Sequence, residues 1–555
     1  MSRLFALPLA LFLALSTSAQ KKTSKEDTSF VSGMVTKMAD GAPLRKAHLS
    51  LKSVDDPNRV IGAVTDADGR FALRAIDPGP YRLTVSRVGF VTQEYGQRKP
   101  NTPGAVLTLH PGQELKDLIF RLIPASVISG RIFDDDGEPL PSVVVEAFRQ
   151  VYSEGKRSRT TASRVETNDL GEYRLHGLPP GRYFVSSVYP TWSRSGGEDD
   201  SSSAEAQAEG YAPLYYPGTP DASKATPITI KPGEEISSID ILMRKVAVHQ
   251  IRGYVYNQVT HKHGQGVNLF LLPKTNSSEW DFPNSVDVRK PDGSFVIPEV
   301  LPGSYMLISF WADDEVQYVN QQMIDVGNAD LDGIAVVVAP GIDIAGRIIW
   351  DGNPSYEKDE LMVLPQPVGI PFEIRGQVRV ASNNLFTLKR VGEGTYRAAV
   401  TGMSRDSYIK EVKYGEASAI KDGFTVTRGE PSTLEIIISS RGARLQGTVV
   451  DADGLPLPGL SVVLVPELSR RENYQLYKTQ TTDQYGHFDL RGIAPGDYKV
   501  FSWEEVEPDS WQDPEFLKPF EDQGQVITLH DDDRNTVKVT AIGGKTSEPR
   551  KTIMY

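Results

Sequence analysis

A stretch of 14 residues, DGRFALRAIDPGPY from Asp68 to Tyr81, recurs four more times along the chain and decides its fold. The later copies are LGEYRLHGLPPGRY, DGSFVIPEVLPGSY, NNLFTLKRVGEGTY and YGHFDLRGIAPGDY. Asp68 and Gly69 predict a tight turn, because glycine adopts positive φ at little cost. The alternation that follows puts Phe71 and Leu73 on one face of a half-buried strand, and a second turn leads into the strand that begins at Tyr81. One strand-turn-strand block is therefore used five times.

Each copy carries a signature made of a turn glycine, an aromatic residue, a second turn and a tyrosine. A tyrosine at this point can bury its ring while its hydroxyl bonds to loop backbone, as in the tyrosine corner of immunoglobulin-like sandwiches. In the fourth copy Asn384 replaces the turn glycine and also tolerates positive φ. We therefore interpret the signature as structural; its residues are Gly69, Phe71, Pro78, Gly79, Tyr81, Gly171, Tyr173, Pro180, Gly181, Tyr183, Gly293, Phe295, Pro302, Gly303, Tyr305, Phe386, Gly394, Tyr396, Gly486, Phe488, Pro495, Gly496 and Tyr498.

A second shared element, VSGMV, ISGRI, IRGYV, IAGRI or LQGTV, stands at the head of each unit. Its glycines, Gly33, Gly130, Gly253, Gly346 and Gly447, lie 97, 123, 93 and 101 residues apart, which is the size of one sandwich domain. The predicted organisation is a signal peptide at 1–19, a flexible N-terminal tail at 20–29, β-sandwich modules at 30–125, 126–245, 246–340, 341–440 and 441–542, and a C-terminal tail at 543–555. The second module carries a loop insertion at 190–225, and the fourth is degenerate.

The run G-x-V, D-G-x-P-L, G-x-F-x-L-x-x-I-x-P-G-x-Y-x-L-x-V resembles the carboxypeptidase regulatory-like domain. That family is a transthyretin-like sandwich of about seven strands, grouped with the starch-binding-like and Cna B-type sandwiches. The segment YYPGT, Tyr215 to Thr219, is similar to repeats in exported bacterial proteins of the family. The resemblance covers essentially the whole mature chain and implies an all-β fold, a tandem array of about five transthyretin-like (Ig-like) seven-stranded β-sandwich modules.

Composition and the N-terminus limit the function classes. The 555 residues include no cysteine, which excludes disulfides, a cysteine nucleophile and a zinc-thiolate site. The net charge of −12 argues against a nucleic-acid partner and against adhesion to anionic lipid. Arg3, the apolar run from Leu4 to Leu15 and the small residues before Ala19 predict a cleaved signal peptide. The apolar run is too short for a comfortable transmembrane helix, and the sequence has no other run of about 18 apolar residues. We expect an exported protein, periplasmic or extracellular.

No catalytic or cofactor motif is evident. The zinc peptidases after which the family is named need a His-x-x-Glu pair, whereas His110 precedes Pro-Gly-Gln-Glu, one residue too far. A Gly-x-Ser-x-Gly elbow, a phosphate loop and a Gly-x-Gly-x-x-Gly loop are also missing from the sequence. His261 and His263 lack an evident third ligand and are interpreted as polar loop residues. The chain is thus predicted to be a non-enzyme without cofactor or metal.

The acidic turns TDADGR, FDDDGEP and VDADGLP, and Asp531 to Asp533, raise a calcium alternative. An EF-hand loop wants glycine at its sixth position and glutamate at its twelfth, and neither matches. Asp-Gly is favourable turn chemistry, which is the preferred interpretation. Cna B-type relatives imply a Lys-Asn or Lys-Asp cross-link aided by a buried glutamate, but Glu299 and Lys389 belong to no repeated set, so none is expected here.

Loop aromatics are the candidate ligand residues, because sugar rings stack on such side chains. They are Trp192, Tyr211, Tyr215, Tyr216, Trp280, Trp503 and Trp511. The first half of the insertion, rich in Ser, Gly and acidic residues, predicts a flexible loop. In the alternative interpretation APLYYPGT packs over the open end of its own sandwich.

Two function classes stand, with an unrecognised hydrolase as a distant third. The first is an exported, non-catalytic array of modules that binds polysaccharide or an envelope protein through its loops. The second is a purely structural spacer or assembly component without a small-ligand site. A sugar-binding module should expose a planar aromatic pair, whereas a spacer should bury its loop aromatics at module junctions.

Overall fold

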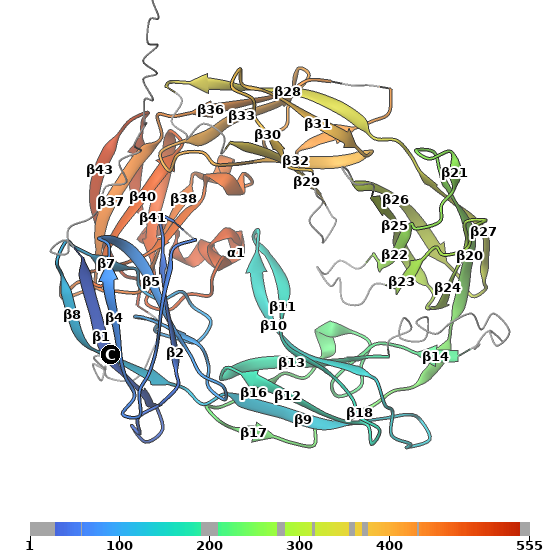
Figure 1. Ribbon diagram of the computed structural model, residues 1–555, viewed down its shortest axis with the longest axis horizontal. Coiled ribbons are helices and arrows are strands. Elements are labelled where there is room, and N and C mark those ends of the chain that lie inside the picture. The colour runs from blue at the N-terminus through green and yellow to red at the C-terminus, as the bar shows by residue number, and fades with distance from the viewer. Residues whose placement is uncertain are drawn as a thin grey trace, which may run out of the picture.

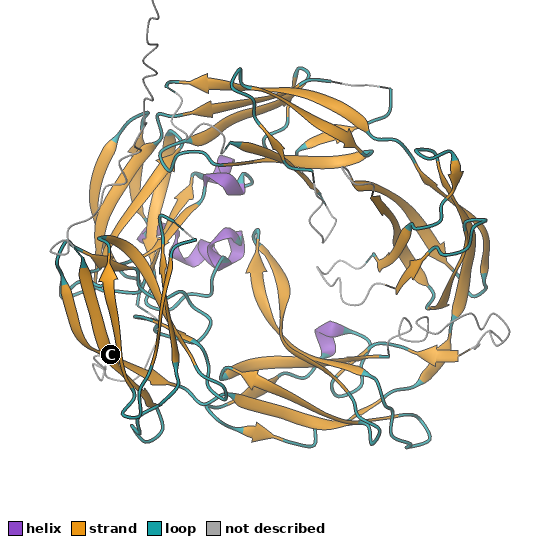
Figure 2. Ribbon diagram, viewed as in Figure 1, coloured by secondary structure: helices purple, strands orange, loops and turns teal. Residues whose placement is uncertain are grey.

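The computed structural model describes residues 28–56, 58–189, 209–274, 284–312, 317–353, 361–368, 376–429 and 432–543. Strands dominate these residues and form five β-sandwiches (Figure 2), each with two sheets around its own cluster of buried apolar side chains. The predicted all-β fold, a tandem array of about five sandwich modules, is confirmed. The predicted signal peptide at 1–19 and nearly all of the C-terminal tail lie outside the described residues.

The first two modules are built from strands β1 to β18. The first module has sheets ordered β4-β1-β8 and β3-β2-β5-β6, with β7 also on β5. Its strands are β1 (Ser29–Lys37), β2 (His48–Ser53), β3 (Val60–Val64), β4 (Arg70–Ile76), β5 (Gly79–Ser86), β6 (Gln93–Glu94), β7 (Leu107–Leu109) and β8 (Glu114–Leu122).

The second module has sheets β12-β9-β17, with β18 on β9, and β11-β10-β13-β15, with β16 on β13. Its strands are β9 (Ser126–Phe133), β10 (Val144–Ser153), β11 (Lys156–Glu166), β12 (Glu172–Leu178), β13 (Gly181–Val188), β14 (Glu209–Tyr211), β15 (Leu214–Tyr215), β16 (Ile228–Ile230), β17 (Glu235–Ile236) and β18 (Ile241–Leu242), with a short 3-10 helix at Ala222–Lys224.

The third and fourth modules follow after β19 (Lys245–Ala247), which pairs with β14. The third has sheets β21-β20-β24, with β27 on β20, and β23-β22-β25-β26. Its strands are β20 (His249–Asn257), β21 (Lys262–His263), β22 (Asn268–Pro273), β23 (Asn284–Asp287), β24 (Ser294–Val300), β25 (Gly303–Ala312), β26 (Gln317–Val326) and β27 (Leu331–Val338). The fourth has sheets β31-β28-β36-β33-β34 and β30-β29-β32-β35. Its strands are β28 (Ile342–Asp351), β29 (Met362–Pro367), β30 (Val378–Arg379), β31 (Leu385–Val391), β32 (Gly394–Thr401), β33 (Tyr408–Tyr414), β34 (Ala417–Ser418), β35 (Phe424–Val426) and β36 (Leu434–Ser439).

The fifth module has sheets β40-β37-β43 and β39-β38-β41-β42. Its strands are β37 (Ala443–Val450), β38 (Ser461–Pro466), β39 (Lys478–Thr481), β40 (His487–Ile493), β41 (Gly496–Ser502), β42 (Gln525–Leu529) and β43 (Arg534–Thr540). Helical turns connect them at Leu468–Arg470, Tyr474–Leu476, Ser510–Gln512, α1 (Pro514–Leu517) and Lys518–Gln523. No helix in the described parts of the chain is long and apolar enough to cross a membrane.

The modules share one topology around the head glycine. The first strand of each, β1, β9, β20, β28 or β37, pairs antiparallel with the signature strand and parallel with the last strand or strands. A Cβ atom on Gly33 would lie 2.0 Å from the Leu118 carbonyl oxygen, and one on Gly253 would lie 2.0 Å from that of Ile334. The close approach of the last strand therefore requires glycine at these positions.

The signature tyrosine has the same hydrogen bond in all five modules. Its hydroxyl donates to the backbone carbonyl four residues earlier, at 2.8 Å (Tyr81 to Asp77), 2.7 Å (Tyr183 to Pro179), 2.8 Å (Tyr305 to Leu301), 3.0 Å (Tyr396 to Gly392) and 2.8 Å (Tyr498 to Ala494). Four of the five residues are buried, and Tyr305 is partly buried. Burial raises the pKa of Tyr305, Tyr396 and Tyr498 to about 12. The repeated stretch thus builds a tyrosine corner in each sandwich.

The five modules form a closed ring (Figure 1). The chain runs round it once, and the first module lies against the second and also against the fifth. The hairpin β10-β11 of the second module points toward the middle of the ring, where α1 of the fifth module also lies (Figure 1). An array of sandwiches can equally form an open rod, so the closing contacts decide the shape of this chain.

Candidate functional site

The junction between the first and fifth modules closes the ring. Backbone bridging joins Val106 to Asp483, and Gln484 exchanges two hydrogen bonds with the backbone of Thr108. Gly459 packs so tightly here that a Cβ atom on it would lie 2.3 Å from the Gly96 carbonyl oxygen. Backbone and side-chain groups of both modules are therefore fitted to each other.

Polar side chains surround this contact. Lys99 forms an ion pair with Glu505 at 2.6 Å, and Gln113 donates to the Tyr485 hydroxyl at 3.2 Å. A pocket of about 380 Å³ opens beside them, lined by residues 98–103, 459–461 and 503–508 and by Arg149. Residues of the first, second and fifth modules line this pocket.

The hairpin β10-β11 ties the second module to the far side of the ring. At its tip the Glu154 carboxylate accepts hydrogen bonds from Arg397 of the fourth module at 3.3 Å. Gly155 lies against the fifth module, since a Cβ atom on it would be 2.5 Å from the Gln512 carbonyl oxygen. The hairpin acts as a brace across the ring.

The fourth and fifth modules share an ion-pair cluster. Asp351 accepts from Lys410 at 2.6 Å and from Arg441 at 2.8 Å, and these contacts, that with Lys410 first, lower the pKa of Asp351. Arg441 also pairs with Asp531 at 3.2 Å, and Asp531 accepts from the Tyr408 hydroxyl. These charges join neighbouring modules.

Trp503 and Trp511, two predicted ligand residues, are buried in the fifth module, at 3% and 4% exposed. The Trp503 ring stacks on Phe501 at 5.3 Å and on Trp511 at 6.4 Å between centroids, with interplanar angles of 5° and 12°. They form a second core on this module's sheet, on the side covered by the segment around α1. The ring faces are occupied by protein and are not open to a sugar.

The tyrosines predicted in the second module are half buried. Tyr211 packs on Tyr189 at 5.3 Å, and Tyr215 makes an edge contact with Phe148 at 5.9 Å. Both Tyr211 and Tyr216 pack against the core of this module, and β15 pairs with β13. This is the arrangement of the alternative interpretation, in which the segment covers its own sandwich. Two further candidates, Trp192 and Trp280, lie outside the described residues.

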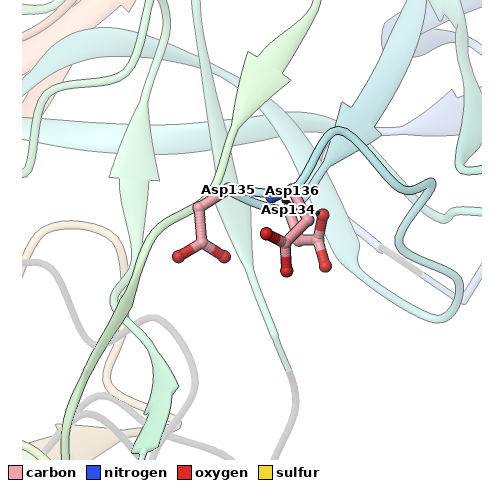
Figure 3. Close-up of side chains that lie close together, drawn as sticks. All are labelled: Asp134, Asp135 and Asp136. Atoms are coloured by element: carbon pink, nitrogen blue, oxygen red, sulfur yellow. Dashed lines mark hydrogen bonds between the residues drawn. The ribbon is translucent and has the colours of Figure 1, made fainter.

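The acidic turn Asp134-Asp135-Asp136 brings three carboxylates within 4.8 Å of one another (Figure 3). The Asp134 carboxylate already accepts from the backbone N–H of Asp136 at 3.0 Å and of Glu138 at 2.8 Å. The Lys245 ammonium lies 4.0 Å from Asp135 and 3.9 Å from Asp136. The Asp451 carboxylate accepts from the backbone N–H groups two and four residues later in the same way. The Asp134 carboxylate therefore stabilises its own turn. His261 and His263, which were predicted to be polar loop residues and not metal ligands, are exposed around β21.

A model of the carboxypeptidase regulatory-like domain matches residues 31–122 and 127–235. These ranges correspond to the first two modules, which are similar to this domain family. The three later modules share the tyrosine corner and the head glycine of these regulatory-like domains.

Curated relatives of the chain include the human BOS complex subunits NOMO1 and NOMO2, each 22% identical over 393 residues. The match covers 67% of this chain and 27% and 26% of the relatives, so the chain spans about a quarter of their length. Among solved structures, a streptococcal ancillary pilin is 14% identical, with 56% of this chain and 98% of the pilin covered and a TM-score of 0.20. GBS52, a minor pilin of Streptococcus agalactiae, is 15% identical, with coverages of 40% and 97% and a TM-score of 0.23. These similarities to pilins are too weak to indicate a function.

One aromatic pair was missed by the sequence analysis. The first and third residues after the head glycine share one face of the first strand. They are Met34 and Thr36 in the first module and Arg131 and Phe133 in the second, but Tyr254 and Tyr256 in the third. These tyrosines are 60% and 43% exposed on β20. The alternation in IRGYVYN was the signal, because it places both rings opposite the buried Ile251 and Val255.

Proposed function

We propose that this protein is an exported, non-catalytic scaffold in which a closed ring of five β-sandwich modules holds a protein partner. The observation that carries the proposal is the contact between the first and fifth modules, where Thr108 and Gln484 meet across 376 residues. Domains joined only by linkers move relative to one another. A closed ring instead fixes the spacing and direction of every loop, which is what an assembly platform needs.

Two further observations support this role. Trp503 and Trp511 supply stacking inside the fifth module, and the tip of β10-β11 reaches two other modules. The hairpin contacts join three modules of the ring. The relatives NOMO1 and NOMO2 are by name subunits of a complex, and a role in assembly extends that property to this chain. Sugar binding through Trp503 and Trp511 has less support because their faces are covered, whereas for Trp192 and Trp280 it stays a prediction from sequence.

The test is partner capture with an intact and an opened ring. Gln484→Ala/Tyr485→Ala removes side-chain contacts of the junction, and Gln265→Ala, an exposed glutamine bonded within the third module, is the matched control. Cross-linking in the source cells should give one partner at a fixed ratio with the wild type and the control. The opened ring should lose it. Equal capture by the opened variant, or turnover of a peptide or glycan library by the purified protein, would contradict the scaffold role.

Export is tested separately. The predicted cleavage after Ala19 means that the mature protein should begin at Gln20. N-terminal sequencing of protein recovered from outside the cytoplasm gives the answer. A chain that retains Met1 in the cytoplasmic fraction would remove the extracytoplasmic part of the proposal.

A further inference from the structure

Tyr254 and Tyr256 form an exposed aromatic platform on the third module. They stand two residues apart on β20, so their rings are spaced by about 7 Å along one face of the sheet. In the sheet register Tyr254 lies beside Ser294 of β24 and Ala335 of β27, and Tyr256 lies beside His263 and Val337. Strands β20, β24 and β27 lie on the outer side of the ring (Figure 1). The platform therefore lies on the outer sheet of the third module, and Val337 at its edge also lines a pocket with Glu393 and Arg428 of the fourth module.

The exposure of this platform is unusual for a strand at this place in the fold. Tyr254 is 60% and Tyr256 43% exposed, and Val296 and Val337 at its sides are 39% and 40% exposed. The other four modules carry no such tyrosine pair; their corresponding residues are Met34, Thr36, Arg131, Phe133, Arg347, Ile349, Thr448 and Val450. A contiguous exposed patch that includes two aromatic rings is a mark of a binding surface.

The size of the platform indicates the class of ligand. Two tyrosines and two valines at these exposures offer roughly 300 Å² of surface. A specific protein partner covers about 800 Å² on each side, so the apolar patch alone is well below the area of a whole protein interface. It is large enough for two or three sugar rings, whose C–H faces are apolar and stack on aromatic faces.

The charges beside the platform favour a neutral ligand. Arg252 precedes Tyr254 on the same face, and its guanidinium bonds to Asp330 and to Asp332 at 3.0 Å each and to Gln250 at 2.8 Å. This cation is compensated and offers little attraction to a polyanion or an anionic lipid surface. Asp332, which is exposed, leaves carboxylate oxygens that can accept from ligand hydroxyls.

We propose that the Tyr254/Tyr256 platform binds a neutral oligosaccharide or polysaccharide chain that runs along β20, with neighbouring sugar rings stacked on the two tyrosines. Hydroxyl groups of the bound sugar meet the Arg252-Asp332 pair at one end and His263 near the other. The site is independent of the scaffold role, because it lies on the outer face and uses no residue of the ring-closing junction.

The test measures binding of the whole protein to soluble neutral polysaccharides, namely a β-1,3-glucan, a xyloglucan, a galactomannan and starch, by affinity electrophoresis and titration calorimetry. Tyr254→Ala/Tyr256→Ala should weaken binding at least tenfold. Tyr254→Phe/Tyr256→Phe keeps both stacking faces, so its affinity should stay within about threefold of wild type. A tenfold change in affinity corresponds to about 1.4 kcal/mol of binding free energy. Val60→Ala/Val64→Ala, two exposed valines on β3 of the first module, is the matched surface control and should bind as wild type.

Each other outcome overturns the proposal. These outcomes are no binding to any neutral polysaccharide, equal binding by the double-alanine variant, or equal loss in the double-phenylalanine variant. Preferential binding to alginate or phosphatidylglycerol vesicles would assign the face to an anionic ligand instead. A change of oligomeric state in the double-alanine variant, seen by light scattering, would assign it to protein contact. Partner capture by the double-alanine variant separates this site from the scaffold role, because the scaffold predicts that capture is unchanged.

Discussion

Thr108 of the first module and Gln484 of the fifth exchange two hydrogen bonds although 376 residues separate them. The Thr108 N–H donates to the Gln484 side-chain oxygen at 2.9 Å, and the Gln484 amide donates to the Thr108 carbonyl at 2.7 Å. A side-chain amide here takes the place of a neighbouring strand, because it satisfies both backbone groups of one residue. The ring is closed by this type of contact rather than by a shared hydrophobic core.

Ring closure predicts a specific chemical cross-link. Lys99 and Glu505 lie 2.6 Å apart, so carbodiimide treatment should join them by an amide bond. Peptide mass spectrometry should find the Lys99-Glu505 link in monomeric protein. The Lys410-Asp351 pair, also at 2.6 Å but within one module, is the positive control. Recovery of the control link alone would mean that the ring is open in solution.

Substitution of a head glycine should destabilise its module strongly. A Cβ atom on Gly33 would overlap the Leu118 carbonyl, and overpacking of this kind costs about 3 kcal/mol. Gly41→Ala is the control, because Gly41 has positive φ but nothing within 4 Å of the added atom, and its cost should be about 1 kcal/mol. Thermal unfolding, with hydrogen exchange of the first module as the readout, measures the stability loss of each variant. Similar losses in the two variants would show that the close strand contact is not the reason for the glycine.

The tyrosine corners should make stability fall at alkaline pH. Burial raises the pKa of Tyr396 and Tyr498 to about 12, whereas tyrosines of the unfolded chain titrate near 10. The unfolded state therefore loses protons first, and the free energy of unfolding declines as pH rises from about 10 through about 12. Melting temperatures between pH 8 and 11 should show the decline.

Tyr498→Phe isolates one corner. At pH 8 the variant should lose about 1 kcal/mol, because the hydroxyl no longer donates to the Ala494 carbonyl. Its fifth module should also show a weaker alkaline decline than wild type. An unchanged pH dependence in hydrogen exchange of the fifth module would mean that this tyrosine does not titrate with unfolding.

Trp503→Ala should act on stability. Loss of a buried tryptophan costs about 3–5 kcal/mol, and the empty space would fall between Phe501 and Trp511. Trp503→Phe should cost much less, since it retains an aromatic face and the indole N–H has no hydrogen-bond partner within the described residues. Circular dichroism and proteolysis of the fifth module measure the difference. A well-folded alanine variant with altered ligand binding would instead favour the ligand role predicted for Trp503.

The local structure could be predicted because its causes lie within a few residues. Gly69 needs positive φ for its turn, and the alternation from Phe71 to Leu73 divides one strand between core and solvent. Tyr81 reaches a carbonyl only four residues away. The exposed pair Tyr254 and Tyr256 obeys the same alternation, so its exposure could also be predicted from the sequence.

The aromatic loops could not be placed in this way. Trp503 and Trp511 follow no alternation, and their burial depends on how the segment around α1 folds back over a sheet. Tyr211 is held by the pairing of β14 with β19, two short strands 34 residues apart from Tyr211 to Lys245. Such contacts join residues whose separation carries no periodic signal.

The sequence by itself determined five sandwiches, because period-two alternation, positive-φ turns and corner tyrosines are enforced by neighbouring residues. Only the tertiary structure decided that the sandwiches close into a ring. That closure depends on Thr108 of β7 meeting Gln484 and on Gly459 fitting against Gly96, and each contact joins two segments whose local sequences are independent of each other. Local rules fix the modules, whereas complementarity between distant surfaces fixes their arrangement.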